Sequence, residues 1–327
     1  MLFSDRLLNP VHLSFDLHAD VFNEVSKKCI KDLFLIGKEA VICISQVLRN
    51  GLKLEFSYRH IYFESVNGMF QSDSDNFSKK LVQLFAPYVT EVSFNYYKNS
   101  GSPESHHLFF EALSKDQKQK KLTIVKLRVV NEFVIEAVKK LNEKNIPVTL
   151  HDPVKELFLN LPGLHFEELS ISKDWYDDNC FFFEYLTRNH LPCTFRKLNA
   201  SDVHLRNSVL EKENVILDVE EVSLALSFVV RDEFVQLKKK FPNAKKLTIR
   251  YIYGNLRAFD FQELWNEKRN CIEDAPQQEI IANFQVRFDC LKRRYQQIIV
   301  SFDGEKIDEN TFRWTSSKNK FKMLNLM

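Results

Sequence analysis

The stretch 122–152, LTIVKLRVVNEFVIEAVKKLNEKNIPVTLHD, shows a β-strand, an amphipathic helix and a second strand in succession. β-branched residues predict strands over 122–129 and 146–152. Residues 131–145 place apolar side chains on one helical face and charged ones on another, and Asn145 and Pro147 are expected to end the helix. This β-α-β unit predicts an α/β protein. The apolar face consists of Phe133, Val134, Ala137, Val138 and Leu141.

The alternation of short strands and helices continues through most of the chain beyond residue 50. Two polar segments, 70–80 and 98–107, are expected to be exposed loops, and 259–276 a longer mixed insertion. The tail, 315–327, shows no repeat pattern and is expected to fray. Further strands are predicted at 52–58, 89–97, 166–172, 193–201, 214–222, 244–252 and 296–303. Further helices are predicted at 76–86, 105–114, 177–189, 230–240 and 277–294.

Two segments resemble the L-x-x-L-x-L core of a leucine-rich repeat, LPGLHFEELSISKD at 161–174 and FPNAKKLTIRYIYGN at 241–255. Strand centres early in the chain recur every 21 to 30 residues, within the period range of α/β solenoids. Later spacings are ragged, about 32 residues from Leu217 to Ile249 and about 51 from there to Val300. This favours an irregular leucine-rich-repeat-like β-α solenoid, with an ordinary α/β or α+β domain and a mixed sheet as the alternative.

Residues 13–40, LSFDLHADVFNEVSKKCIKDLFLIGKEA, predict short helices in close succession. Leu13, Leu17 and Val21 follow the i, i+4, i+8 spacing of one helical face, and Ser26 stands where an N-cap starts the next helix. The layout is similar to the F-box, with an L-P opening, an apolar helix, an L-S step, K-D and then L-x-L-V-S/C-K. Those places are held by Leu13-Ser14, Val21-Phe22, Val25-Ser26, Lys28-Cys29 and Leu33-Phe34-Leu35-Ile36-Gly37-Lys38. The chain departs from the family at Ser14 in place of proline, at Cys29 in place of the acidic residue and at Ala40 in place of an aromatic.

The resemblance implies an F-box-like helical module over 1–50 and a substrate-binding domain over 51–327, as in the F-box families expanded in nematodes. Such proteins are non-catalytic substrate-recognition subunits of Skp–cullin–F-box ubiquitin ligases. The implied partners are a Skp-type adaptor with its cullin complex and an unidentified protein substrate. The alternative is an interaction scaffold that engages no ligase and binds a peptide, a protein or RNA. The implied adaptor-binding residues are Leu13, Leu17, Val21, Phe22, Val25 and Ile36.

Composition indicates a globular protein with 44% apolar and 28% charged residues. A net charge of +2 argues against a nucleic-acid groove or an anionic membrane surface as partner. The apolar run over 30–48 is interrupted by charges, so no transmembrane helix is expected. The six cysteines lack paired spacing and no signal peptide precedes them, which favours reduced thiols in an intracellular protein of the cytoplasm or nucleus. The 29 phenylalanines predict a core filled by aromatics.

Motifs for catalysis, cofactors and metals are missing from the sequence. The seven glycines stand far apart, so no phosphate-binding loop is expected. His106 and His107 are adjacent and are expected to face solvent in a loop rather than to bind zinc. Asp174, Asp177 and Asp178 lack calcium-loop spacing and are expected to cap a helix. The sequence therefore predicts neither an enzyme nor a cofactor or metal.

Overall fold

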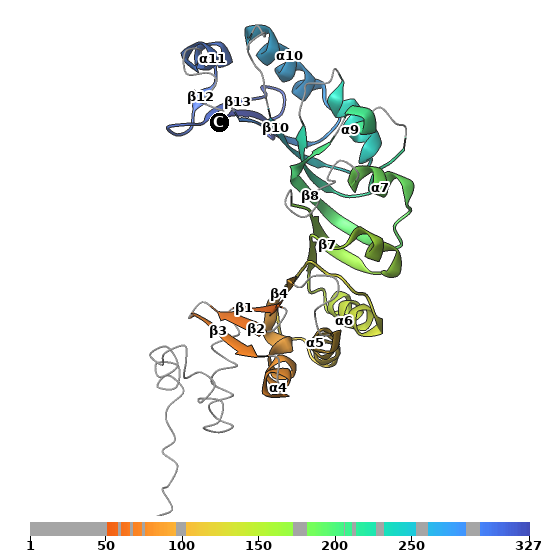
Figure 1. Cartoon of the computed structure of the whole chain (residues 1–327). Helices are drawn as coiled ribbons and strands as arrows, with labels where there is room; N and C mark the ends of the chain where they lie inside the picture. Colours follow the sequence, from red (N-terminus) through yellow and green to blue (C-terminus); the bar gives the residue numbers. More distant parts are fainter. Residues whose placement is uncertain are drawn as a thin grey trace, which may run out of the picture. The chain divides into compact units, whose positions relative to one another are not determined.

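The computed structural model places the chain in two compact units, one ending at Leu122 and one beginning at Thr123. Each unit combines strands with helices, so the prediction of an α/β protein is confirmed (Figure 1). The residues described are 51–57, 60–65, 68–73, 76–95, 103–172, 182–205, 207–210, 214–226, 232–252, 261–285 and 295–327.

The first unit has its strands in the order β4-β1-β2-β3. In chain order, its described elements are β1 (Leu52–Ser57), β2 (His60–Ser65), β3 (Gly68–Asp73), α4 (Asn76–Phe85), η2 (Ala86–Tyr88), β4 (Val89–Asn95) and α5 (Pro103–Lys115). β1, β2 and β3 form an antiparallel meander, and β4 runs parallel to β1. The helices α4 and α5 contact each other.

Phenylalanines fill the core of the first unit, as the composition predicts. Phe56 on β1 stacks on Phe94 of β4 with ring centroids 5.4 Å apart. Phe109 of α5 meets Phe56 edge-on at 6.3 Å and its neighbour Phe110 at 5.0 Å. All four rings are buried, and stacked and edge-on pairs of this kind each add about 0.5–1.5 kcal/mol beyond their buried area.

The second unit carries a mixed sheet with the strand order β5-β6-β7-β8-β9-β10-β11-β14-β13-β12. Its strands are β5 (Leu122–Val125, which spans the boundary), β6 (Val148–His151), β7 (His165–Ser170), β8 (Thr194–Leu205), β9 (Glu221–Leu226), β10 (Lys246–Ile252), β11 (Glu279–Gln285), β12 (Glu305–Lys306), β13 (Phe312–Thr315) and β14 (Lys322–Leu326). From β6 to β11 each strand pairs in parallel with the next one along the chain. β14 lies parallel to β11 and antiparallel to β13.

Helices line the outer side of these strands, where α6, α7, α9 and α10 follow one another in Figure 1. The helical segments are α6 (Glu132–Glu143), η3 (Lys155–Asn160), α7 (Phe182–Arg188), α8 (Asn207–Leu210), α9 (Glu233–Lys240), α10 (Phe261–Asp274) and α11 (Tyr295–Phe302). The strand side chains toward this layer are apolar and buried, as Leu247 and Ile249 show. The core of the second unit therefore lies between the sheet and its helices.

The β-α-β unit at 122–152 has the predicted order, with α6 between β5 and β6. The side chain of Asn131 accepts a hydrogen bond from the Val134 amide at 3.0 Å and caps the helix. Asn145 adopts a left-handed φ of 55°, and the Ile146 amide donates to the Leu141 carbonyl at 2.9 Å, which closes a Schellman motif. Asn145 thus ends the helix, as predicted.

Two predictions near the end of the chain are wrong, since the helix expected at 277–294 contains β11 and the strand expected at 296–303 is α11. In β11, Ile280, Ala282 and Phe284 alternate with half-exposed residues, which is the period of a strand. In α11, Ile298 and Phe302 are four residues apart, on one helical face, and both are buried. Phe302 meets Trp265 of α10 edge-on at 5.3 Å. Tertiary packing therefore decides both segments.

Five further expectations need correction. The tail 315–327 does not fray, because β14 lies inside the sheet with Leu324 and Leu326 buried. The expected loop at 70–80 contains the end of β3 and the start of α4, the expected loop at 98–107 contains the start of α5, and the expected insertion at 259–276 contains α10. The strand predicted at 214–222 starts only at Glu221, because the amide of Ile216 donates to the Lys240 carbonyl at the end of α9 instead of to a strand.

Candidate interaction surface

The side of the second unit's sheet opposite the helices carries polar side chains. On β10, buried Leu247, Ile249 and Tyr251 alternate with half-exposed Lys246, Thr248 and Arg250. Because successive side chains of a strand point to opposite faces, the half-exposed set shares one face. The same alternation holds on β11. This open face is a surface that the second unit offers to a partner.

A row of alternating charges crosses the open face. Lys197 on β8 pairs in register with Glu221 on β9, Glu221 with Lys246 on β10, and Lys246 with Glu279 on β11. The amino group of Lys197 lies 3.2 Å from Glu221, and that of Lys246 lies 2.7 Å from Glu279. Glu168 on β7, in register with Lys197, extends the row by one more charge. We call these five residues the charge ladder.

Arg196, which precedes Lys197 in the sequence, also bonds to Glu221 of the charge ladder. Its guanidinium donates two hydrogen bonds to Glu167 and one to Glu221 at 2.9 Å. These bonds lower the pKa of Glu167 and raise that of Arg196. Burial alone would raise the pKa of Glu221, but its bonds from Lys197 and Arg196 outweigh burial and lower it. Because roughly a third of each side chain is exposed, each pair contributes only about 0.2–1 kcal/mol.

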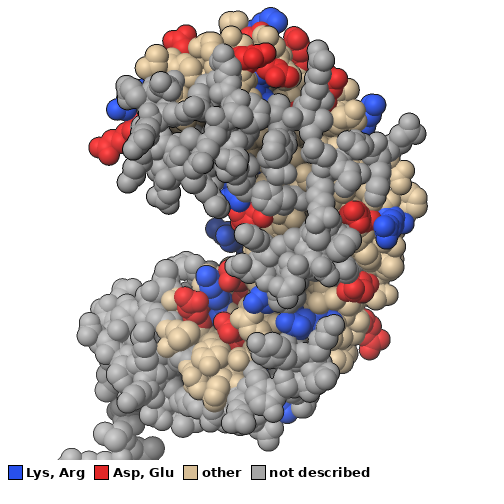
Figure 2. Space-filling model, turned by 45° about the horizontal axis from the view of Figure 1, so that its top comes forward, with Lys and Arg blue, Asp and Glu red and all other residues tan. Residues whose placement is uncertain are grey.

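The signs of the five ladder charges alternate, and three glutamates against two lysines leave a net charge of only −1, so the ladder does not create a strong field of one sign. On the face of the molecule that Figure 2 shows, the acidic and basic side chains of the described residues are interspersed. A balanced pattern of this kind favours discrimination among protein partners over general attraction of polyanions.

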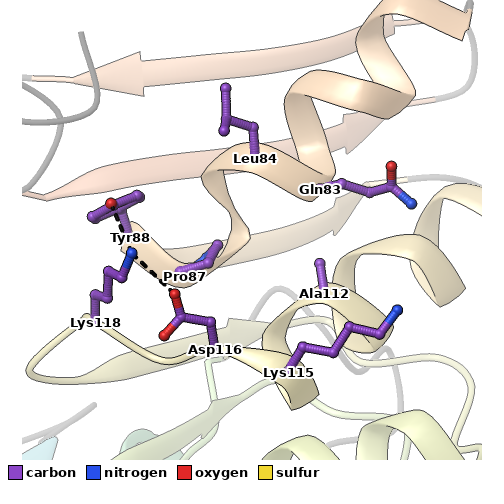
Figure 3. Close-up of a pocket in the computed structure, with 8 residues that line it drawn as sticks. All are labelled: Gln83, Leu84, Pro87, Tyr88, Ala112, Lys115, Asp116 and Lys118. Atoms are coloured by element: carbon purple, nitrogen blue, oxygen red, sulfur yellow. Dashed lines mark hydrogen bonds and ion pairs between the residues drawn. The ribbon is translucent and has the colours of Figure 1, made fainter. Parts of the chain in front are cut away.

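A shallow cavity of about 470 Å³ lies in the first unit, beside η2 and the end of α5 (Figure 3). Lys118 reaches the Tyr88 hydroxyl at 3.2 Å and the Asp116 carboxylate at 3.0 Å. The hydrogen bond to Asp116, with that to Tyr88, raises the pKa of Lys118. A lysine held in its charged form cannot act as a base, so Lys118 does not provide this cavity with a general base. It is lined by Gln83, Leu84, Pro87, Tyr88, Ala112, Lys115, Asp116 and Lys118.

A second cavity, of about 530 Å³, lies in the second unit between the end of α7 and the segment before β9. Its one thiol, Cys193, is buried, and burial raises the pKa of Cys193 to about 12. A thiol with such a pKa stays protonated and is a poor nucleophile. Cys193 therefore does not provide this cavity with a reactive thiolate.

The described residues hold one fully buried ion pair, between Lys268 of α10 and Glu233 of α9 at 2.6 Å. The Tyr251 hydroxyl also donates to Glu233, and the Lys268 amino group lies 5.0 Å from the centre of the Tyr251 ring. All three side chains are shut off from solvent and none lines a described cavity. We read this cluster as a structural link between α9, α10 and β10.

The structure describes some of the sites predicted from the sequence and not others. The residues Leu13, Leu17, Val21, Phe22, Val25 and Ile36 lie outside the described part of the chain, as do Asp174, Asp177 and Asp178. The expectation that His106 faces solvent in a loop is wrong, because it lies in α5 and is 2% exposed. Where the structure describes the chain, no group of three metal-binding side chains occurs and no helix is long and apolar enough to cross a membrane.

Comparisons with protein-family models, with curated proteins and with solved structures find no match to this chain. The family expected from residues 13–40 consequently rests on those residues. The charge ladder on the open face was not predicted, because it forms only when residues 24 to 33 positions apart in sequence come into register on neighbouring strands.

Proposed function

We propose that the chain is the substrate-recognition subunit of a Skp–cullin–F-box ubiquitin ligase. In this proposal, residues 13–40 dock on a Skp-type adaptor and the second unit binds the target protein. The observation that carries the proposal is the gap-free correspondence of residues 13–38 to the F-box pattern. The apolar residues Leu13, Leu17, Val21, Phe22, Val25 and Ile36 are the proposed adaptor contacts.

The arrangement of the second unit supports a binding role. From β6 to β11 the strands follow each other in the sheet in chain order, as repeats do in a leucine-rich-repeat-like solenoid. We interpret the region as a degenerate array of this kind. Its open polar face and the charge ladder suit a protein partner, since a complementary charge pattern selects a partner more than it strengthens binding.

Two binding sites on one chain are sufficient for the proposed role. The adaptor contact holds the chain on the ligase, and the substrate contact then holds lysines of the target protein near the ubiquitin-loaded E2 enzyme. Tethering replaces a bimolecular encounter by an effective concentration that reaches the millimolar range for short connections. No catalytic group on this chain is required.

Co-precipitation with a purified Skp-type adaptor tests the proposal. The double variant Leu17→Asp, Val21→Asp should lose adaptor binding, because carboxylates cannot be buried in an apolar contact without a partner. The matched control is Leu159→Asp, Val235→Asp, which places the same charges at side chains that are 48% and 47% exposed. The control should bind as the unmodified chain does, and circular dichroism should show both variants folded.

Ser14 favours a second candidate function, an interaction scaffold outside any ligase, because the family has proline at that place. If the unmodified chain fails to bind the adaptor, the scaffold becomes the better account. Equal binding by all three proteins would remove residues 17 and 21 from the contact.

A further inference from the structure

A second polar row crosses the open face near the carboxyl ends of the parallel strands β10, β11 and β14 and the start of the antiparallel β13. Arg250 of β10 is in register with Asn283 of β11, Asn283 with Asn325 of β14, and Asn325 with Arg313 of β13. Register partners on neighbouring strands point to the same face. The row therefore presents two guanidinium groups with two amides between them.

The hydrogen bonds of the row fix the direction of both amides. Arg313 is a pure donor, and its Nε donates to Asn325 Oδ1 at 2.9 Å. Asn325 must then present its Nδ2 to the other side, where it donates to Asn283 Oδ1 at 2.8 Å. Asn283 in turn presents its Nδ2 away from Asn325, toward the β10 side of the row. The orientation of each amide follows from the arginine.

At the β10 end of the row, two donor atoms lack an acceptor among the described residues. Arg250 Nε is buried and lacks a hydrogen-bond partner, and its Nη2 lies 2.9 Å from Asp202. Among the described residues, Asn283 Nδ2 has no acceptor either, and the Arg313 guanidinium has no carboxylate partner. Buried donors are almost always satisfied in folded proteins. An external acceptor with negative charge would satisfy this end of the row and also meet Arg313.

We propose that this row binds an acidic segment of a partner protein in extended conformation, with one carboxylate at Arg250 and Asn283 and a second at Arg313. The two arginines lie three strand spacings apart, about 14 Å. An extended peptide rises about 3.3 Å per residue and shows alternate side chains on one face. Acidic residues four positions apart, about 13 Å, therefore fit both arginines.

The inference deepens the proposed function, because in that proposal the acidic segment belongs to the ligase substrate. It does not depend on the adaptor contact, which involves residues 13–40. The two can therefore fail separately: peptide binding without adaptor binding would leave the row as the site of a scaffold. Adaptor binding without peptide binding would overturn the inference and leave the ligase role standing.

Fluorescence anisotropy with the full chain tests the inference. The probe is a labelled Gly–Ser peptide that carries two glutamates four residues apart. Comparison peptides carry the glutamates three residues apart, where they point to opposite faces, or carry glutamines. The first peptide should bind more tightly than both. Arg250→Gln and Arg313→Gln should each weaken its binding about tenfold or more, because each removes a charge-assisted hydrogen bond.

Two further variants separate binding from folding. Arg188→Gln removes a charge from α7 at a side chain that is 73% exposed and should leave binding unchanged. Asn283→Asp supplies the missing acceptor within the chain, so it should abolish peptide binding while the thermal midpoint stays equal or rises. Equal affinity for all peptides, or binding unaffected by the arginine variants, would overturn the inference. Tighter binding of a labelled oligouridylate that the same variants abolish would assign the row to RNA instead.

Discussion

At the scale of single residues, His106 is the least expected feature of the first unit. Its ring centroid lies 4.2 Å from that of Phe94 and 5.1 Å from that of Phe110, and neither ring nitrogen has a hydrogen-bond partner. Burial lowers the pKa of His106 to about 3, and the neighbouring His107 adds to the effect. His106 therefore stays neutral in the folded unit at mildly acidic pH, at which a solvent-exposed histidine is protonated.

The first unit should lose stability as the pH falls from about 6.5 to about 3. In this window the unfolded chain binds a proton at His106 that the folded chain excludes, so unfolding takes up a proton. The loss from this residue approaches about 1.4 kcal/mol per pH unit in the middle of the window. His106→Leu should remove this part of the pH dependence. It should also raise the free energy of unfolding by about 1 kcal/mol at neutral pH, because two unsatisfied buried nitrogens disappear.

Urea unfolding between pH 4 and pH 7 measures the effect. The control His190→Leu changes an exposed histidine and should keep the slope of the unmodified chain. Parallel pH profiles for the unmodified chain and His106→Leu would show that His106 does not remain neutral inside the fold.

At the scale of elements, α6 is formed by local signals that the sequence displays. Asn131 caps its start, Val134, Ala137, Val138 and Leu141 make its buried face, and Asn145 ends it. Each of these signals acts within one or two turns. Elements of this kind were predicted closely.

Two substitutions at Asn131 should distinguish the effect of its Oδ1, which accepts a hydrogen bond, from that of its Nδ2, which has no partner. Asn131→Ala leaves the Val134 amide without its acceptor and should lower the free energy of unfolding of the second unit by about 1 kcal/mol. Asn131→Asp keeps the acceptor, removes a buried Nδ2 that has no partner, and adds a favourable charge at the helix start. It should be as stable as the unmodified chain or more so. Chemical denaturation compares the three, and an alanine variant of unchanged stability would speak against the cap.

Two elements near the end of the chain, whose conformation depends on distant contacts, were predicted wrongly. The segment 279–285 has the helix-compatible sequence EIIANFQ, but as β11 it pairs over its whole length with β10. The segment 295–302 is rich in β-branched residues, yet it is α11 because Phe302 packs on Trp265. In both cases a partner some thirty residues away overrides local preference.

The candidate surface was hidden from sequence reasoning for the same reason. The charges of the ladder form no motif in the sequence. Only the register of four parallel strands brings Lys197, Glu221, Lys246 and Glu279 into one row. Arg250 and Arg313 are 63 residues apart in sequence and belong to one row only through the two strands between them.

At the scale of the whole molecule, the last strand is an internal part of the second unit's sheet. β14 lies between β11 and β13, so it forms hydrogen bonds along both edges. On the helix side of the sheet, Lys322 donates to the carbonyls of Glu273 and Ala275 at 3.0 and 2.6 Å, which satisfies the end of α10. The connection of β11 to β13 within the sheet and the end of α10 thus depend on residues 322–326.

Removal of residues 322–327 should therefore unfold the second unit. Leu324 and Leu326 are buried, and Leu→Ala at such sites costs about 2–5 kcal/mol each, against a total stability of about 5–15 kcal/mol for a typical domain. Leu324→Ala alone should lower the free energy of unfolding within the first of these ranges, whereas Phe321→Ala, at a side chain that is 54% exposed, should change it little. Limited proteolysis and circular dichroism of the three proteins measure the outcome. A truncated chain as protease-resistant as the full chain would mean that β14 is dispensable, and the second polar row would then lose the strand that joins Asn283 to Arg313.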